Sequence, residues 1–311
     1  MGHDKLRKFA ENETFDCLVQ PSAAEILKDG YFNLSDHPLK GHWNRDIFSV
    51  SDKEADSSGC SPLKTSASRT PSTSGYLPLT MPRVARFSGG TTAADSASQM
   101  EREICVELGC GKGEYTIDLA KRFPERNYIG VDIKGARLWK GAKYATENGM
   151  KNVAFLRTRI EFITALFGKD EISEIWLTFS DPQLKSENSR LSSPLFLERY
   201  RSFLKKGGIV NLKTDSRFLY EYTKAVCEEN SLEILASTTD LYGGQRLPMD
   251  ELYEVQTFYE KMFLAQGYKI NYLRFRIDHE GPYAHPSDFD AAYWRSVEGP
   301  RRSFGHETHK Q

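Results

Sequence analysis

A short glycine-rich segment, residues 107–113 (Glu-Leu-Gly-Cys-Gly-Lys-Gly), is the first place in this sequence where residue types and spacing suggest chemistry. It follows an apolar run and precedes a helical pattern, so it is typical of a loop between a strand and a helix. Gly109, Gly111 and Gly113 would let the backbone turn sharply and approach a ligand closely. Ordinary strand-to-helix turns can share this pattern, so the loop by itself does not identify a ligand.

Acidic residues around the loop narrow the class of ligand. Glu107 precedes the glycines and would attract a cationic group and repel a phosphate. Glu114 occupies the last glycine position of the dinucleotide fingerprint, which argues against a pyrophosphate and against a nicotinamide dehydrogenase. Asp132 ends the next expected strand, where an acid can accept hydrogen bonds from both ribose hydroxyls. A nucleoside that carries an amino acid fits this pattern, so we expect S-adenosylmethionine as the cofactor.

A second motif, residues 178–183 (Thr-Phe-Ser-Asp-Pro-Gln), follows the fourth expected strand. In an open parallel sheet, ligands bind beyond the carboxyl ends of the strands. Asp181 would therefore face the reactive end of the cofactor, and Lys185 follows soon after. The alternative is an Asp-Pro turn that merely ends the strand.

These residues together resemble the bacterial-type tRNA (guanine-N7)-methyltransferase family. The resemblance begins in residues 107–185 and covers about residues 1–48 and 101–277. The further segments that carry it are 5–9 (KLRKF), 39–44 (LKGHWN), 190–194 (RLSSP), 212–215 (LKTD) and 257–260 (TFYE). The pairing of D-P-x-x-K with T-x-x-E is far more specific than the glycine loop.

The resemblance implies a role for each of these residues. It assigns the cofactor to Glu107 and Asp132. The expected cofactor site also includes Gly109, Gly111 and Gly113 of the loop, Asp181, and Arg159 at the position that would meet the adenine. The resemblance places Asp181 between the cofactor and the target base, as the catalytic residue. It assigns the guanine nucleotide, expected in the variable loop of tRNA, to Lys185, Asp215, Thr257 and Glu260. Thr257 and Glu260 are three residues apart on an expected helix and share a face, although the same spacing also forms a helix cap.

The sequence departs from the family at two positions. The family usually has an acid where Arg159 stands, and Arg159 could stack on adenine but cannot accept a hydrogen bond from it. The family usually has a Trp where Gln183 stands. We expect RNA contacts from three groups of basic residues. They are Lys5, Arg7 and Lys8, then 40–45 with Trp43, and last Arg199, Arg201, Lys205 and Lys206, although solvated surface charge also explains the last group.

Other functions also have to be considered. An RNA-binding module without turnover would keep the same motifs, and so would an enzyme that needs a second subunit. A methyltransferase acting on an exocyclic amine of adenine or on a protein amide would place an aromatic ring after two prolines at this strand end, and Gln183 offers no ring. No metal site is expected, because the histidines have no ligand spacing.

Alternating short apolar runs and helical patterns predict the fold from residue 103 onward. Such a pattern indicates an α/β, Rossmann-like methyltransferase sheet of seven mostly parallel strands with helices on both faces. The expected strands are 103–108, 127–132, 153–157, 173–179, 209–214, 232–238 and 268–277. The expected helices are 114–123, 135–149, 160–167, 195–205, 217–229 and 251–265.

Composition sets the remaining expectations. Of the 52 residues from Ser49 to Met100, 18 are Ser or Thr, so we expect a disordered insertion over 49–102. Residues 1–48 should pack on or near the catalytic domain at 103–280, and 281–311 should form a flexible tail. The net charge is −1 and the five cysteines form no C-x-x-C pair, which favours reduced thiols, and no apolar run is long enough to span a membrane. We therefore expect a cytoplasmic protein, with a nuclear or organellar location left open.

Overall fold

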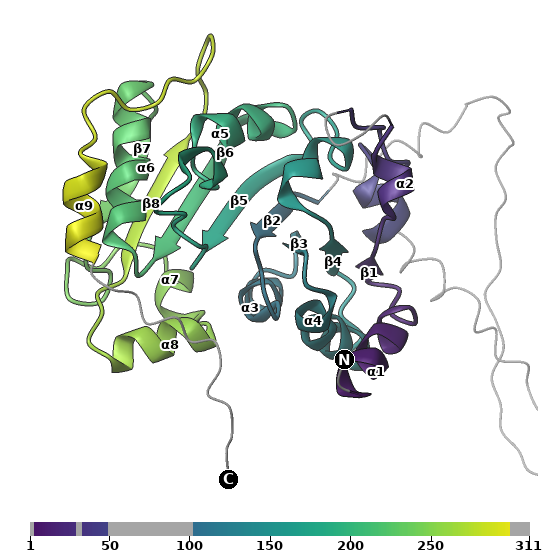
Figure 1. Cartoon of the computed structure of the whole chain (residues 1–311). Coiled ribbons are helices and arrows are strands. Elements are labelled where there is room, and N and C mark those ends of the chain that lie inside the picture. Colours follow the sequence, from purple (N-terminus) through teal and green to yellow (C-terminus); the bar gives the residue numbers. More distant parts are fainter. Residues whose placement is uncertain (1–2, 29–32, 49–101, 299–311) are drawn as a thin grey trace, which may run out of the picture.

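The computed structural model describes residues 3–28, 33–48 and 102–298 (Figure 1). The Ser/Thr-rich insertion predicted over 49–102 lies outside the described residues except for Arg102. No helix among the described residues is long and apolar enough to cross a membrane.

An α/β sheet of eight strands forms the centre of the molecule, in the order β1-β4-β3-β2-β5-β6-β8-β7. The strands are β1 (Leu18–Val19), β2 (Ile104–Leu108), β3 (Asn127–Asp132), β4 (Val153–Arg157), β5 (Ile172–Thr178), β6 (Leu204–Thr214), β7 (Ile234–Thr238) and β8 (Asn271–Arg276). All neighbours pair in parallel except β8, which is antiparallel to both β6 and β7. The mostly parallel sheet of the sequence prediction is confirmed.

One strand more than the predicted seven is present. The additional strand, β1, has only two residues and pairs with Phe155 and Leu156 of β4. It extends the sheet with residues from the N-terminal segment, so residues 1–48 contribute to the catalytic sheet itself. A two-residue strand has no periodicity of its own, which is why the sequence pattern did not reveal it.

The predicted helices appear in the predicted order, and others are additional to them. The helices are α1 (His3–Asn12), α2 (Ala23–Ile26), α3 (Glu114–Arg122), α4 (Gly135–Glu147), α5 (Pro194–Arg201), α6 (Arg217–Glu229), α7 (Glu251–Glu254), α8 (Phe258–Ala265) and α9 (Ala291–Glu298), with a 3₁₀ helix at Ile160–Ala165. Of these, α1, α2 and α9 are additional to the predicted ones. The helix predicted over 251–265 is broken into α7 and α8 by residues 255–257. The helix predicted over 195–205 ends at Arg201, and β6 begins at Leu204, so the Gly207-Gly208 pair lies inside this strand rather than before it.

Two apolar clusters cover the two faces of the sheet. One contains side chains of α3, α4 and α7, among them Tyr115, Leu138 and Leu252. The other contains side chains of α5 and α6, among them Phe196 and Tyr222. Buried apolar residues of β2, β3 and β4 alternate between the two clusters, so the helices sandwich the sheet as the fold prediction requires (Figure 1).

Trp43 does not have the role expected from the sequence. Its side chain is fully buried, its Nε1 donates to the Leu166 carbonyl at 2.8 Å, and its ring packs on Phe167. An aromatic ring in this position anchors the N-terminal segment to the sheet and offers no face to an RNA base. The expectation that Trp43 contacts RNA is therefore wrong.

The described part of the C-terminal segment, residues 281–298, also differs from the flexible tail expected there. Helix α9 packs on α6, and Phe289 lies edge-on to the rings of Phe218 and Tyr222. Phe218 N donates to the Glu298 carboxylate at 3.0 Å, so α9 ends by capping the first turn of α6. The few aromatic residues in a polar stretch are enough to hold this helix against the domain.

Candidate cofactor and guanine cleft

A cleft of about 650 Å³ opens at the carboxyl ends of the central strands. The order of strands reverses between β2 and β5, and such a switch point is where open α/β sheets bind ligands. Seven of the residues expected in the site line this cleft, namely Glu107, Gly109, Gly111, Asp132, Asp181, Asp215 and Thr257. They follow four adjacent strands, β3, β2, β5 and β6, or begin α8, so the sheet brings together residues that are 150 positions apart.

The glycine loop is held open by its backbone conformation. Gly109 and Gly111 have φ values of +82° and +59°, and a Cβ atom at either position would meet nothing within 4 Å. These glycines are therefore required by conformation, and they leave the loop backbone accessible to a ligand. Gly113 has a φ of +73° as well, and in addition its Cβ would lie 2.4 Å from the Phe155 ring.

Glu107 lies at the floor of the cleft and is almost fully buried. Its carboxylate accepts hydrogen bonds from Thr116 N at 2.9 Å, from the Thr116 hydroxyl and from the Thr178 hydroxyl. Burial nevertheless raises the pKa of Glu107 from 4.5 to about 7, against the lowering effect of these hydrogen bonds. A cationic group bound beside Glu107 would favour its ionised form.

Asp132 ends β3 and fixes the shape of the loop. One carboxylate oxygen accepts from Gly111 N at 3.0 Å and the other from Lys134 N at 2.7 Å. The side chain is held by two backbone donors and still lines the cleft. Each oxygen keeps acceptor capacity for a further donor, such as a hydroxyl.

Asp181 is exposed in the cleft, just beyond β5. Its Oδ1 accepts from Gln183 N at 2.9 Å, which closes a tight turn. Phe179 and Gln183 have φ values of +50° and +48°, a conformation that non-glycine residues rarely adopt. Strained backbone of this kind is typical of functional sites, and here it aims Asp181 into the cleft.

A buried ion pair joins β6 to the first turn of α8. Lys213 and Glu260 have fully buried side chains, and Lys213 Nζ lies 2.8 Å from Glu260 Oε1. Nζ also donates to the carbonyls of Leu252 and Val255 at 2.7 and 3.2 Å, and the Tyr242 hydroxyl donates to Glu260 Oε1 at 2.6 Å. Burial lowers the pKa of Lys213, and Glu260 opposes that shift. Glu260 Oε2 is buried without a hydrogen-bond partner.

The N-terminus of α8 forms one wall of the cleft. Thr257 caps it by accepting from Glu260 N at 3.1 Å. Phe258 N donates to the Glu114 carboxylate at 2.9 Å, and Lys112 lies 5.2 Å from the centre of the Phe258 ring. Glu114, which excluded a dinucleotide at the sequence level, thus ties the glycine loop to α8.

Four of the residues expected in the site are not among those that line the cleft. Gly113 faces the Phe155 ring, and Lys185 is exposed on the surface. Arg159 pairs with Glu161 at 3.1 Å, next to Ile160, which does line the cleft. Glu260 lies behind the cleft wall, in contact with Lys213.

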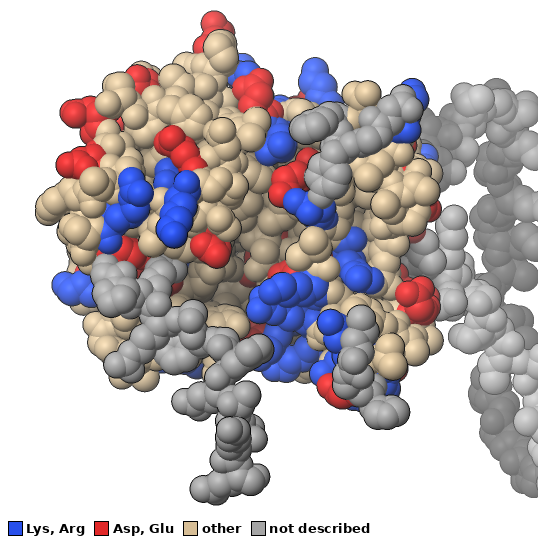
Figure 2. Space-filling view, viewed as in Figure 1, with Lys and Arg blue, Asp and Glu red and all other residues tan. Residues whose placement is uncertain are grey.

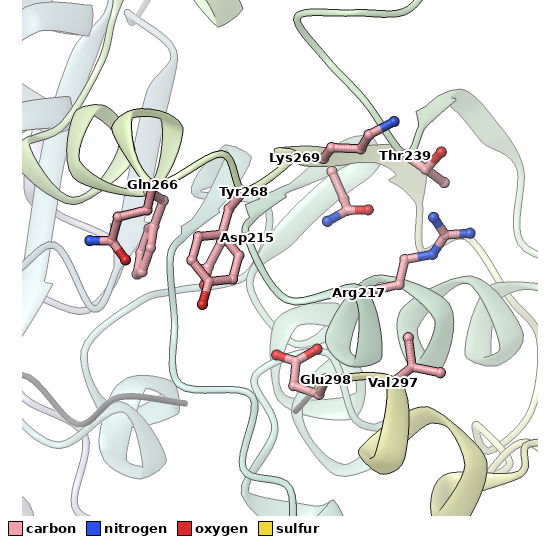
Figure 3. Close-up of a pocket in the computed structure, with 10 residues that line it drawn as sticks. Asp215, Arg217, Thr239, Gln266, Tyr268, Lys269, Val297 and Glu298 are labelled. Carbon is pink, nitrogen blue, oxygen red and sulfur yellow. The ribbon is translucent and has the colours of Figure 1, made fainter. Parts of the chain in front are cut away.

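A smaller cavity of about 280 Å³ adjoins the cleft and shares Asp215 and Phe263 with it. Figure 3 shows Arg217, Lys269 and Thr239 on one side of this cavity, Gln266 on the other, and Glu298 and Val297 of α9 along its base. Asp215 therefore stands on the wall between the cleft and a second hollow that α9 completes.

Sequence reasoning missed several residues of this site. Lys213 lies within the L-K-T-D motif, but nothing in the motif indicates that its side chain is buried against Glu260. Arg137 lines the cleft from α4, and Lys112 lines it from the loop. The cations repeated every third residue along 134–143 were the one sequence signal that could have indicated that α4 contributes to the site.

The raised pKa of Glu107 predicts a pH-dependent stability. The folded protein binds the Glu107 proton more tightly than the unfolded chain does, so stability falls as the pH rises from about 4.5 to about 7. A pKa shift of this size corresponds to a loss of roughly 3 kcal/mol in the free energy of unfolding across this pH range. The Glu107→Gln variant lacks this loss, so its unfolding free energy relative to wild type should increase through that window in urea titrations without cofactor. A difference that stays constant with pH would contradict this assignment.

The buried ion pair predicts a non-additive double mutant. Lys213→Met leaves the Glu260 charge buried and unpaired, which should cost about 3–5 kcal/mol. Adding Glu260→Leu removes that charge and should recover part of the loss, with the remainder due to the two carbonyls that lose their donor. Denaturant unfolding of wild type, both single variants and the double variant would measure the coupling. Additive effects would show that the pair does not act as a unit.

Comparisons with known proteins show which family the chain belongs to. A family model described as "Putative methyltransferase" matches residues 101–273. The tRNA (guanine-N(7)-)-methyltransferase of Bacteroides thetaiotaomicron is 48% identical over 204 residues, which cover 65% of this chain and 80% of that protein. The protein of the same name from Christiangramia forsetii is 39% identical over 276 residues, covering 88% of this chain and 98% of that protein. A solved antibiotic-related methyltransferase has a TM-score of 0.42 at 20% identity, over 56% of this chain and 86% of that one. The chain belongs to the tRNA (guanine-N7)-methyltransferase family.

Proposed function

We propose that this protein transfers a methyl group from S-adenosylmethionine to N7 of a guanine in the variable loop of tRNA. The observation that carries the proposal is the position of Asp181, exposed in a cleft whose floor is Glu107 and whose neighbouring wall is Asp132. Membership of the family supplies the reaction and the substrate.

The residues of the cleft fit the cofactor. The volume of the cleft, about 650 Å³, falls within the range of small-molecule sites, about 300–1,000 Å³. Asp132 is positioned to accept hydrogen bonds from ribose hydroxyls, and Glu107 to compensate a cationic amino group. When bound, S-adenosylmethionine supplies an electrophilic methyl group on its sulfonium.

Asp181 acts by electrostatics in this mechanism. Guanine N7 has a free lone pair and no proton, so no general base is required for its in-line attack on the methyl carbon. The new bond forms as the sulfur–carbon bond breaks, and positive charge develops on the guanine ring. The Asp181 carboxylate stabilises that charge, and its hydrogen bond to Gln183 N holds it in place before the reaction. The cleft otherwise contributes by holding N7 about 3–3.5 Å from the methyl carbon.

Asp215 and Thr257 line the cleft beside Asp181 and would contact the guanine nucleotide. Glu260 would recognise the guanine edge opposite N7, since a carboxylate accepts from N1–H and the exocyclic amine. Its Oε1 is already taken by Lys213 and Tyr242, whereas its buried Oε2 has no hydrogen-bond partner. Guanine would complete the hydrogen bonding of Oε2 if the segment between α7 and α8 shifts, and that segment is where the predicted helix is broken. Lys185, exposed after the Asp181 turn, would meet the RNA backbone.

The reaction and its position can be tested together. The protein is incubated with labelled S-adenosylmethionine and unmodified tRNA, and the product is cleaved with borohydride and aniline, which cut at 7-methylguanine. Label and cleavage at a single variable-loop guanine are the expected result. Cleavage elsewhere would contradict the proposed position. Absence of label, with cofactor binding retained in calorimetry, would favour an RNA-binding module or an enzyme that needs a second subunit.

Removing the Asp181 carboxylate should separate catalysis from cofactor binding. We expect Asp181→Ala to lower kcat by about 10²–10³-fold, the usual effect of losing one electrostatic contact to a transition state, while the Kd for S-adenosylmethionine changes little. Asp181→Asn keeps the size of the side chain and should be similarly impaired. Asp288→Ala, at an exposed aspartate far from the cleft, is the matched control. Equal losses in kcat and cofactor affinity would make Asp181 a cofactor ligand alone.

A further inference from the structure

Helix α4 and the residue before it carry a row of four cations. Lys134, Arg137, Lys140 and Lys143 are spaced three residues apart, so each lies beside the next while the row winds half-way round the helix, and we call them the α4 ridge. Lys134, Arg137 and Lys140 are exposed, and Lys143 is partly exposed. The only acid on α4 is Glu147, at its last residue.

The ridge begins at the catalytic cleft. Arg137 lines the cleft together with Asp132 and Asp181, and Lys112 lines both the cleft and an adjoining groove of about 420 Å³. This groove lies between α3 and α4 and is also lined by Lys140 and Lys143. Figure 2 shows Lys and Arg side chains gathered over α3 and α4, beside the hollow. A basic track therefore leads from the groove into the site.

The first turn of α4 is an unfavourable place for positive charge. The N-terminus of a helix carries partial positive charge, and acids are normally preferred there. The first turn of α4 has no acid, and Lys134 provides no side-chain cap. Free backbone N–H groups at a helix start also attract phosphate. Cations in this position oppose the helix dipole, which makes sense if an anion binds there.

Much of the positive charge is available to such an anion. Within the described part of the chain, Lys112, Lys134 and Arg137 form no ion pair. Lys140 pairs with Glu114 at 3.1 Å and Lys143 with Glu147 at 3.6 Å. Exposed pairs like these contribute about 0–1 kcal/mol, so a phosphate can replace the acid at little cost.

Aromatic rings lie among these cations. The Trp139 ring has Arg7, Lys8 and Lys143 within 5.0–5.3 Å of its centre. Tyr144 is exposed, with Lys121 at 4.4 Å. Basic residues interleaved with aromatic side chains are typical of surfaces that bind single-stranded RNA. The whole chain has a net charge of only −1, so the positive charge of this surface is a local excess that would orient an approaching polyanion.

We propose that the α4 ridge binds the phosphate backbone of the RNA strand that delivers the target guanine to the cleft. This inference rests on the proposed function, and it identifies the surface that binds the RNA substrate next to the cleft. It assigns no RNA contact to the basic residues at the other end of the sheet, Lys205 and Lys206, which line a cavity with Asp278.

The test compares two triple variants of the full chain. The ridge variant is Lys134→Gln/Lys140→Gln/Lys143→Gln, and it leaves the cleft residue Arg137 intact. The control variant is Lys205→Gln/Lys206→Gln/Lys224→Gln, with the same change of charge on β6 and α6. The Kd for unmodified tRNA is measured by fluorescence anisotropy from low to high salt, and methylation is followed in parallel.

The ridge variant should bind tRNA at least tenfold more weakly at low salt. Its slope of log Kd against log salt should fall by about two, since each lost phosphate contact removes roughly 0.7–0.9. The control variant should match wild type in both quantities. The Kd for S-adenosylmethionine should be unchanged in both variants, and the control variant should also keep the kcat of wild type. The melting temperature of the ridge variant should stay close to that of wild type, because the two ion pairs that it loses are exposed and contribute little.

A ridge variant with the Kd and salt slope of the control would overturn the proposal, and the ridge would then be a solvated face or a surface for another protein. Failure of the proposed function would look different. In that case wild type would form no 7-methylguanine, while the binding measurements would still report on the ridge.

Discussion

The buried ion pair between Lys213 and Glu260 is the constraint on which the site depends most. Two opposite charges without exposure to water are stable only when each is well paired, and Lys213 also satisfies the carbonyls of Leu252 and Val255. This single ammonium therefore fixes both the end of α7 and the start of α8 against the central sheet. The ion pair thereby supports the cleft wall formed by Thr257 and Phe258 from the side that faces the protein interior.

The same arrangement links structure to recognition. Glu260 presents one saturated oxygen and one buried oxygen that lacks a partner. An unpartnered buried carboxylate oxygen is costly, and a ligand that donates a hydrogen bond to it would recover that cost. At the floor of the cleft, Glu107 is buried with a raised pKa and is suited to a cation. Glu107 in the cleft and Glu260 behind its wall thus offer one acid to each of the two proposed ligands.

The basic surface around α4 complements this acidic cleft. In the proposed function, Lys and Arg side chains would attract RNA over a distance, whereas acids and backbone would recognise guanine and the cofactor. The cations would then offset the repulsion between the acids of the cleft and the RNA. Glu114 lies at the junction, since it contacts Lys140 of the ridge and Phe258 of the cleft wall.

The sequence by itself determined the alternation of strands and helices, the glycine loop and the acids that follow the strands. These features are local, because periodicity, glycine spacing and strand ends are all read within short windows. The carboxyl ends of parallel strands must meet at one edge, so Glu107, Asp132, Asp181 and Asp215 could be expected to converge. Only the tertiary structure decided that Trp43 is buried, that α9 packs on α6, that β1 joins the sheet, and that Glu260 lies against Lys213. Each of these depends on contacts between residues distant in the chain, for which a pattern in a single segment gives no signal.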